Sequence, residues 1–268
     1  MDDWQRANQQ RWDELTPHHA ASAYYDVAGF KAGRCTLRSI EVAELGDLTG
    51  RSLLHLQCHF GLDTLSWARR GARVTGVDFS EEAIKLAREL AAEVSLAATF
   101  LASRVQDLPD VLCGQFDIVF TSYGVLCWLP DLVPWGRVVA HFLRPGGTFY
   151  MVEQHPFADV FDDSGSAELR AVYSYFHSAE PAACDTQGTY ADRTATIRQR
   201  RSYQWTHPLS DVLSALLGAG LRLEFLHEFA QLSFAKLPAM RQDADGWYRL
   251  PPDRPALPLL YSLKAVKP

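Results

Sequence analysis

The chain has little of what marks membrane proteins or proteins that bind nucleic acid. Its 26 lysines and arginines are outnumbered by 32 acidic residues, for a net charge of -6. A polyanion is bound by a basic surface that neutralises phosphates, so we expect no nucleic-acid partner. The basic run "RQRR" at 198–201 is too short to change that balance. No apolar stretch approaches the roughly 20 residues that cross a bilayer, so no membrane partner is expected either.

Cysteine is also scarce, and no two cysteines form a C-x-x-C pair. The five lie far apart in the chain, at Cys35, Cys58, Cys113, Cys127 and Cys184. An odd number of isolated cysteines is typical of free thiols in a reducing compartment. The N-terminal "MDDWQRANQQ" lacks the basic and apolar regions of a secretory signal. These absences together predict a cytoplasmic protein.

What the chain does contain is a regular alternation of strand and helix patterns from 51 to 153. Strands are expected at "SLLHLQ", "ARVTGVD", "ATFLA", "FDIVFTS" and "TFYMVE". The clearest helix follows Ser80 as N-cap, with acids in its first turn and one apolar face. Another helix is expected to stop at "RPGG". This order predicts βαβ units, and hence a doubly wound α/β fold with a mostly parallel sheet.

The alternation is lost after Glu153. The pieces "AVYSYFH" and "RRSYQWTH" predict strands of a small antiparallel insertion, and the pattern then returns to a helix and two strands. The proline-rich stretch 237–258 is expected to be a long ordered loop. We therefore divide the chain into a helical N-terminal cover at 1–50, an α/β domain at 51–156 and 207–268, and an inserted substrate-recognition element at 157–206.

The stretch "LLHLQCHFGLD", 53–63, admits two interpretations. His55, Cys58 and His59 lie within five positions, which suggests a metal site. However, His55 falls in a strand and His59 in the following turn, so their side chains need not converge, and we predict no metal. The alternative is a strand, turn and helix that offers backbone N–H groups to a ligand at the carboxyl edge of the sheet. Asp78, which ends the next strand, suits the hydroxyls of a ribose there.

Four segments resemble the successive motifs of class I S-adenosylmethionine-dependent methyltransferases of the small-molecule type. They are "LLHLQCHFG", "VTGVDFSEEAIKLAREL", "FDIVFTSYGVLCWLPD" and "FLRPGGTFYMVE". The resemblance implies a Rossmann-like fold with a seven-stranded sheet, S-adenosylmethionine as cofactor and S-adenosylhomocysteine as product.

The resemblance also implies a cofactor loop at Gln57, Cys58, His59 and Gly61. Gln57 and His59 replace the first two glycines of the family motif, and only Gly61 is kept. Because a Cβ restricts φ and narrows the approach of a ligand, we expect the loop to shift or the cofactor to lie differently.

Three further residues take their roles from the resemblance. Asp78 matches the acid that binds the ribose, Phe79 the apolar residue beside the adenine, and Val105 the residue whose N–H meets the adenine ring. Arg104 replaces an acid that accepts from the adenine amino group, and a guanidinium cannot accept a hydrogen bond. Gln106 or Asp107 could supply that acceptor.

Around the methionine part, the resemblance places Ser122 and Tyr123 after the fourth strand and Tyr25 in the N-terminal cover. Tyr123 is a candidate catalytic residue because an aromatic face suits the sulfonium charge. His155, just after the fifth strand, is a candidate base, with His18 and His19 as rivals for that role.

We thus expect methyl transfer from S-adenosylmethionine to O, N or C of a small acceptor. The acceptor is expected to be apolar or aromatic, because the insertion contains Tyr173, Tyr175, Phe176, Tyr190, Tyr203 and Trp205. Two alternatives stay open. The lost glycines and Arg104 suggest a cofactor-binding module without turnover. A nicotinamide-dependent oxidoreductase is disfavoured, because the loop lacks the glycine that admits a pyrophosphate.

Overall fold

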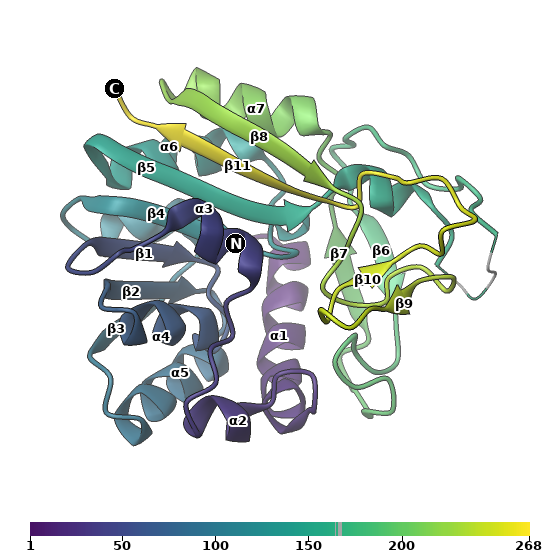
Figure 1. Cartoon of the computed structure of the whole chain (residues 1–268), viewed down its shortest axis with the longest axis horizontal. Coiled ribbons are helices and arrows are strands. Elements are labelled where there is room, and N and C mark those ends of the chain that lie inside the picture. Colours follow the sequence, from purple (N-terminus) through teal and green to yellow (C-terminus); the bar gives the residue numbers. More distant parts are fainter. Residues whose placement is uncertain (164, 166–167) are drawn as a thin grey trace.

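A computed structural model describes residues 1–163, 165 and 168–268, and its centre is one seven-stranded sheet (Figure 1). The strand order is β3-β2-β1-β4-β5-β11-β8, and β11 runs antiparallel to both of its neighbours. The strands are β1 Ser52–Leu56, β2 Arg73–Asp78, β3 Ala98–Ala102, β4 Phe116–Ser122, β5 Leu143–Gln154, β8 Arg222–Phe229 and β11 Leu260–Val266. The predicted fold class is therefore confirmed.

Helices cover both faces of the sheet, as the doubly wound pattern requires. The α-helices are α1 Asp3–Ala21, α2 Val27–Lys31, α3 Ser39–Leu45, α4 Leu62–Arg69, α5 Glu81–Glu93, α6 Leu132–Phe142 and α7 Leu209–Gly218. Side chains of α6 and α7 form one core with Leu54, Val119 and Met151. Their neighbours in the same strands, which point the other way, pack with α3 and α4 in a second core.

β1 and β4 are parallel neighbours, and the strand order reverses between them: β2 and β3 follow on one side of β1, and β4 and β5 on the other. A crevice therefore opens at the carboxyl ends of these two strands. Short 3-10 helices follow three strands at that edge: η1 Val105–Asp110, η2 Leu126–Trp128 and η3 Pro156–Val160. In Figure 1, α1 lies across the same edge, between the sheet and two small antiparallel sheets. These are β6 Ala182–Asp185 with β7 Arg201–Gln204, and β9 Arg241–Gln242 with β10 Tyr248–Arg249.

Polar side chains join α1 to the β6–β7 insertion. Asn8 pairs with both backbone groups of Tyr203, at 2.7 and 2.8 Å. Arg11 is buried and donates to the carbonyls of Thr186, Gly188, Gln199 and Arg200. Glu14 accepts from the backbone N–H groups of residues 198 and 199. Three residues at i, i+3 and i+6 thus bind one face of α1 to the insertion.

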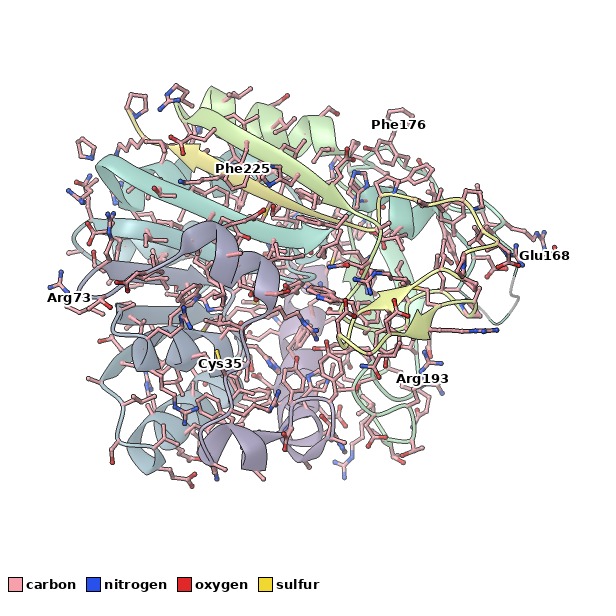
Figure 2. All side chains as sticks on the ribbon, in the orientation of Figure 1. Cys35, Arg73, Glu168, Phe176, Arg193 and Phe225 are labelled. Atoms are coloured by element: carbon pink, nitrogen blue, oxygen red, sulfur yellow. The ribbon has the colours of Figure 1, made fainter. Side chains whose placement is uncertain are left out.

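Three expectations about individual segments are wrong. "AVYSYFH" forms no strand, since only Ala171 makes a bridge, to Phe161, and β7 pairs with residues 182–185 instead. Phe176 points away from the body of the molecule (Figure 2) and is 72% exposed, so no buried face orders this segment. The helix stops next to "RPGG" as expected, since α6 ends at Phe142, but the fifth strand does not begin at Thr148. β5 already begins at Leu143, because the glycines there pair with the backbone of Lys267. The loop 237–258 contains the β9–β10 hairpin.

Candidate active site

The loop after β1 has the backbone of a glycine-rich turn without its glycines. Gln57, His59 and Gly61 all adopt left-handed φ angles, of 56°, 51° and 79°. These are the three positions at which the methyltransferase motif carries glycine. Gln57 and His59 thus adopt a backbone region that glycine favours, and the expectation that the loop shifts or the cofactor lies differently stays a prediction. A left-handed φ costs a non-glycine residue about 1 kcal/mol, so other contacts must hold it.

Those contacts come from both neighbouring strands. The Gln57 side chain donates from Nε2 to the carbonyl of Val125, 2.8 Å away, in the loop after β4. The backbone N–H of His59 donates to Oδ2 of Asp78 at the end of β2, also at 2.8 Å. Gly61 cannot be replaced in the same way, since a Cβ there would lie 2.7 Å from the Phe100 ring. This explains why one glycine of the three remains.

Asp78 occupies the position expected of a ribose-binding acid. Its second oxygen, Oδ1, accepts from the N–H of Ser80 at 2.9 Å, so the carboxylate is fixed at the tip of β2. Burial raises the pKa of this carboxyl to about 6, although the two backbone donors act to lower it. Each carboxylate oxygen accepts one of these bonds and keeps capacity for a further hydroxyl donor.

A small pocket that opens to solvent lies next to this loop. It contains three of the predicted cofactor residues, Gln57, Phe79 and Val105, together with Arg104 and Gln106. Helix α1 supplies further wall residues, and η2 with the residue after it closes the pocket. The lining residues that sequence reasoning missed are Gln5, Asn8, Ser103, Trp128 and Leu129. For two of these residues, Gln5 and Asn8, the sequence contains a signal, because their i, i+3 spacing places them on one face of α1.

Arg104 does not reach the pocket as a free cation. Its guanidinium forms an ion pair with Asp107 at 2.5 Å and donates to Oε1 of Gln5 at 3.0 Å. Oδ2 of Asp107 accepts from Arg104, and Asp107 is not among the residues that line the pocket, whereas Gln106 is. Of the two acceptors considered for an adenine amino group, Gln106 is the better placed.

Cys58 and Ser122 face away from this pocket. Cys58 is buried in the core formed by Phe60, Phe100 and α5, and burial raises the pKa of its thiol. The hydroxyl of Ser122 lies 3.4 Å from both His55 and Asp63, on the side of α4. Their predicted cofactor contacts stay predictions, and only their backbone borders the crevice.

Tyr123 also follows β4 with a left-handed φ, of 47°. Its hydroxyl donates to Oε2 of Glu41 at 2.9 Å. Glu41 is completely buried in α3, and burial, with the nearby Asp63 carboxylate, raises its pKa to about 7. Tyr123 is thus directed toward α3, and its catalytic role stays a prediction.

His155 lies in a different setting from the pocket. Its Nδ1 accepts from the N–H of Phe157, so it is the N-cap of η3. Its Nε2 lies 3.0 Å from Oε1 of Glu228 in β8. Both ring nitrogens have structural neighbours away from the cofactor loop, and its role as a base stays a prediction.

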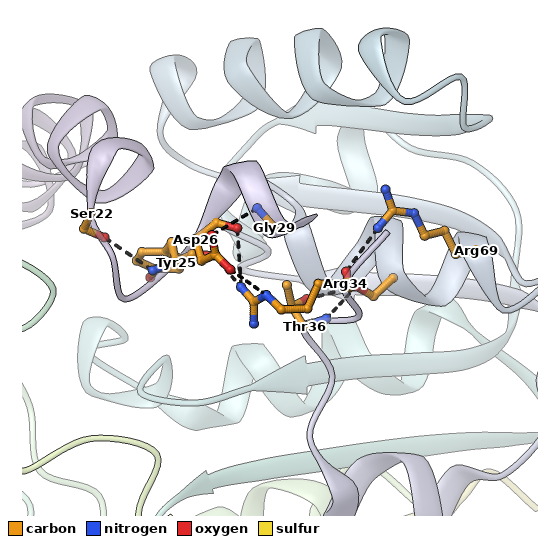
Figure 3. A network of polar contacts seen from close by, with 8 residues as sticks. Ser22, Tyr25, Asp26, Gly29, Arg34, Thr36 and Arg69 are labelled. Carbon is orange, nitrogen blue, oxygen red and sulfur yellow. Dashed lines mark hydrogen bonds and ion pairs between the residues drawn. The ribbon is translucent and has the colours of Figure 1, made fainter. Parts of the chain in front are cut away.

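Tyr25 is brought to the loop by a network in the turn between α1 and α2 (Figure 3). Arg34 donates to the Tyr25 carbonyl at 2.9 Å and forms an ion pair with Asp26 at 3.0 Å. The Tyr25 ring then packs 4.8 Å from that of Phe60 and 5.5 Å from that of His59, measured between centroids. Its hydroxyl bonds to that of Tyr190 in the insertion. The N-terminal cover, the loop and the insertion therefore meet at Tyr25.

Comparison with known proteins supports the resemblance to methyltransferases. A family model described as "Methyltransferase domain" matches residues 54–151. Over this segment the chain is similar to class I methyltransferases. The "Ubiquinone biosynthesis O-methyltransferase" of Bordetella avium is 31% identical over 144 residues, and that of Bordetella pertussis 28% identical over 188. These alignments cover 51% and 68% of this chain, and 59% and 76% of the relatives.

The methyltransferase domain includes β1 to most of β5, and hence the cofactor loop and Asp78. For the fold of the whole chain, the structure titled "CcbJ Methyltransferase from Streptomyces caelestis" matches with a TM-score of 0.60. That match has 18% identity and covers 96% of this chain and 98% of the other. The resemblance to class I methyltransferases is therefore confirmed.

The described residues contain neither a metal-binding group nor a membrane-spanning helix. No three His, Cys, Asp or Glu side chains there come together as a group that could hold a metal ion. Within the same residues, no helix is long and apolar enough to cross a bilayer.

Proposed function

We propose that this protein transfers the methyl group of S-adenosylmethionine to an oxygen of a small aromatic acceptor. The observation that carries the proposal is the left-handed conformation of Gln57 and His59, which keeps the shape of the cofactor loop where its glycines are missing. The printed name O-methyltransferase of the relatives supports oxygen as the target. The cofactor-binding module without turnover and the nicotinamide oxidoreductase are not favoured.

The residues present fit the cofactor. The pocket walls of Phe79 and Val105 suit an adenine, and Gln106 offers a polar edge in place of the family acid. Asp78 would accept hydrogen bonds from both ribose hydroxyls at the tip of β2. When bound, S-adenosylmethionine supplies a methyl group on a positively charged sulfur. The aromatic side chains of α1 and of the turn after it, Trp12 and Tyr25, would keep water from that group.

Thermal unfolding with S-adenosylmethionine, S-adenosylhomocysteine and NAD tests the proposal. A ligand at 100 times its dissociation constant adds ~2.7 kcal/mol, which raises the melting temperature of a domain this size by several degrees. We expect both adenosyl ligands to do so and NAD to have no effect. A shift with NAD alone would refute the proposal.

The Asp78 carboxyl adds a pH dependence to the same measurement. Because its pKa in the folded protein is about 6, the carboxylate that accepts ribose hydroxyls is lost as pH falls through 6. Affinity for S-adenosylhomocysteine should therefore fall between pH 7 and pH 5, measured by calorimetry. Asp78→Asn should bind S-adenosylhomocysteine at least tenfold more weakly, and its affinity should no longer change between pH 7 and pH 5. Asp110→Asn, a change at an exposed carboxylate, should bind this ligand as wild type does.

A further inference from the structure

Unpartnered polar atoms concentrate beside the cofactor loop. Among the described residues, ten buried side-chain nitrogen and oxygen atoms have no hydrogen-bond partner, and six of them belong to Trp12, His19, Gln57 and His59. Both ring nitrogens of both histidines are in this set. Buried polar groups in proteins are nearly always hydrogen-bonded, and each exception calls for an explanation. A ligand that offers hydrogen-bond partners would explain a cluster of them.

The two imidazoles belong to a cluster of packed aromatic rings that we call the imidazole site, made of His19, His59, Trp12, Tyr25 and Tyr190. The ring of His19 stacks on Tyr25 at 5.3 Å and 27°, and lies 4.9 Å from Tyr190. The two imidazole centroids are 5.2 Å apart, and Trp12 packs edge-on against both. Because these rings contact one another, a flat ligand would enter by displacing one of them, and Tyr190, which is 44% exposed, is the ring open to solvent.

The imidazole site is neutral. Burial lowers the pKa of His19 to about 3 and lowers the pKa of His59 well below its ordinary value. The guanidinium of Arg11, which acts on His19 from the same helix, is already bound to the insertion through its carbonyls. A neutral imidazole offers one donor and one acceptor, and an uncharged hydroxyl can pair with either.

The walls indicate which ligand of the proposed reaction enters. Of the five residues, only His59 comes from the segment 54–151 that matches the methyltransferase model, although Phe60 and Trp128 of that segment also pack against these rings. Trp12 and His19 come from α1, Tyr25 from the turn after α1, and Tyr190 from the insertion. A site built mainly by elements outside the cofactor-binding segment is expected to serve the acceptor.

We propose that the imidazole site binds the acceptor as a neutral hydroxylated aromatic ring, with a ring nitrogen of His19 accepting the hydrogen bond of the hydroxyl to be methylated. This inference rests on the proposed function. As the new O–C bond forms, the C–S bond breaks and sulfur keeps its electron pair, while the hydroxyl proton passes to His19. A protonated ether is far more acidic than an imidazolium, so even this weak base accepts the proton once the methyl group has moved.

Calorimetry with 4-methylcatechol, in the presence of S-adenosylhomocysteine, tests the site. We expect wild type to bind the catechol and to bind 3,4-dimethoxytoluene, which has the same ring without hydroxyls, at least tenfold more weakly. His19→Phe keeps a flat ring and removes both nitrogens, so it should weaken catechol binding at least tenfold and leave the affinity for S-adenosylhomocysteine within twofold. It should also raise the melting temperature, because two buried unpartnered atoms are removed.

Two further variants complete the test. His19→Gln keeps a donor and an acceptor and should retain more catechol affinity than His19→Phe. His141→Phe, a change at an exposed position of α6, should leave the affinities for both ligands unchanged. The site is overturned if wild type binds no catechol, if His19→Phe binds it as wild type does, or if His19→Phe weakens S-adenosylhomocysteine equally. Binding of S-adenosylhomocysteine to wild type is measured separately, without the catechol. Failure to bind it would refute the proposed function instead.

Discussion

At the scale of single residues, Gln57 and His59 show how a motif can lose its glycines and keep its shape. A glycine is preferred at a left-handed φ because it has no Cβ, but the preference is only about 1 kcal/mol. The bond from Gln57 to Val125 and the bond from His59 to Asp78 are each strong enough to offset that cost. The loop is therefore maintained by its neighbours in β2 and β4 rather than by its own composition.

A pair of substitutions at His59 isolates the backbone contribution. His59→Gly and His59→Ala both remove the imidazole, so the difference between them reflects φ. We expect the glycine variant to be more stable than the alanine variant by about 1 kcal/mol in urea denaturation. At Glu82, in the first turn of α5, the same pair should show the opposite order, with alanine more stable. Equal stabilities at position 59 would contradict a strained loop.

Sequence reasoning located single residues well where strand ends decide their position. Asp78 ends β2, Phe79 follows it, and Val105 begins the turn after β3. Parallel strands bring their carboxyl ends to one edge. It failed where the decisive contact is distant in sequence. The positive φ of Gln57 depends in part on Val125, 68 positions away, and no local pattern reports such a bond.

At the scale of elements, α1 is the helix whose role the sequence concealed. Its polar residues look like those of a solvated helix, yet Asn8 and Arg11 are almost fully buried against the insertion. The opposite face binds the α/β domain, where Gln9 donates to the Phe79 carbonyl at 2.6 Å and Asp13 accepts from Ser80 at 2.6 Å. A helix with polar partners on both sides shows no apolar stripe, so amphipathic analysis cannot place it.

Arg11→Met tests this coupling. The change leaves several carbonyls of the insertion unpaired and should lower the free energy of unfolding by about 3 kcal/mol. In hydrogen–deuterium exchange, α1 and residues 182–204 should lose protection together, while β4 and β5 keep theirs. Arg6→Met, on the exposed side of α1 where Arg6 pairs with Asp3, serves as the control. Loss of protection in α1 alone would show that the insertion is held by other contacts.

At the scale of the whole molecule, the cover, the sheet edge and the insertion meet around one crevice. The order of the seven strands was predictable, because alternating strands and helices with right-handed connections allow few arrangements. The internal structure of the insertion was not, since "AVYSYFH" has the period of a strand but no sheet face to pack against. The structure of the segment 54–151 can thus be predicted from its sequence pattern. The structures of α1 and the insertion depend on long-range polar contacts, which the pattern does not show.

The position of α1 has a kinetic consequence. The same helix lines the cofactor pocket through Gln5 and Asn8 and carries His19 and Trp12 into the imidazole site. If the acceptor binds there as proposed, it would hold α1 in place beside the pocket, and we expect S-adenosylmethionine to be added first and S-adenosylhomocysteine to be released last. Initial-rate measurements should show product inhibition by S-adenosylhomocysteine that is competitive against S-adenosylmethionine and noncompetitive against the acceptor. Random addition would mean that α1 opens over the two sites separately.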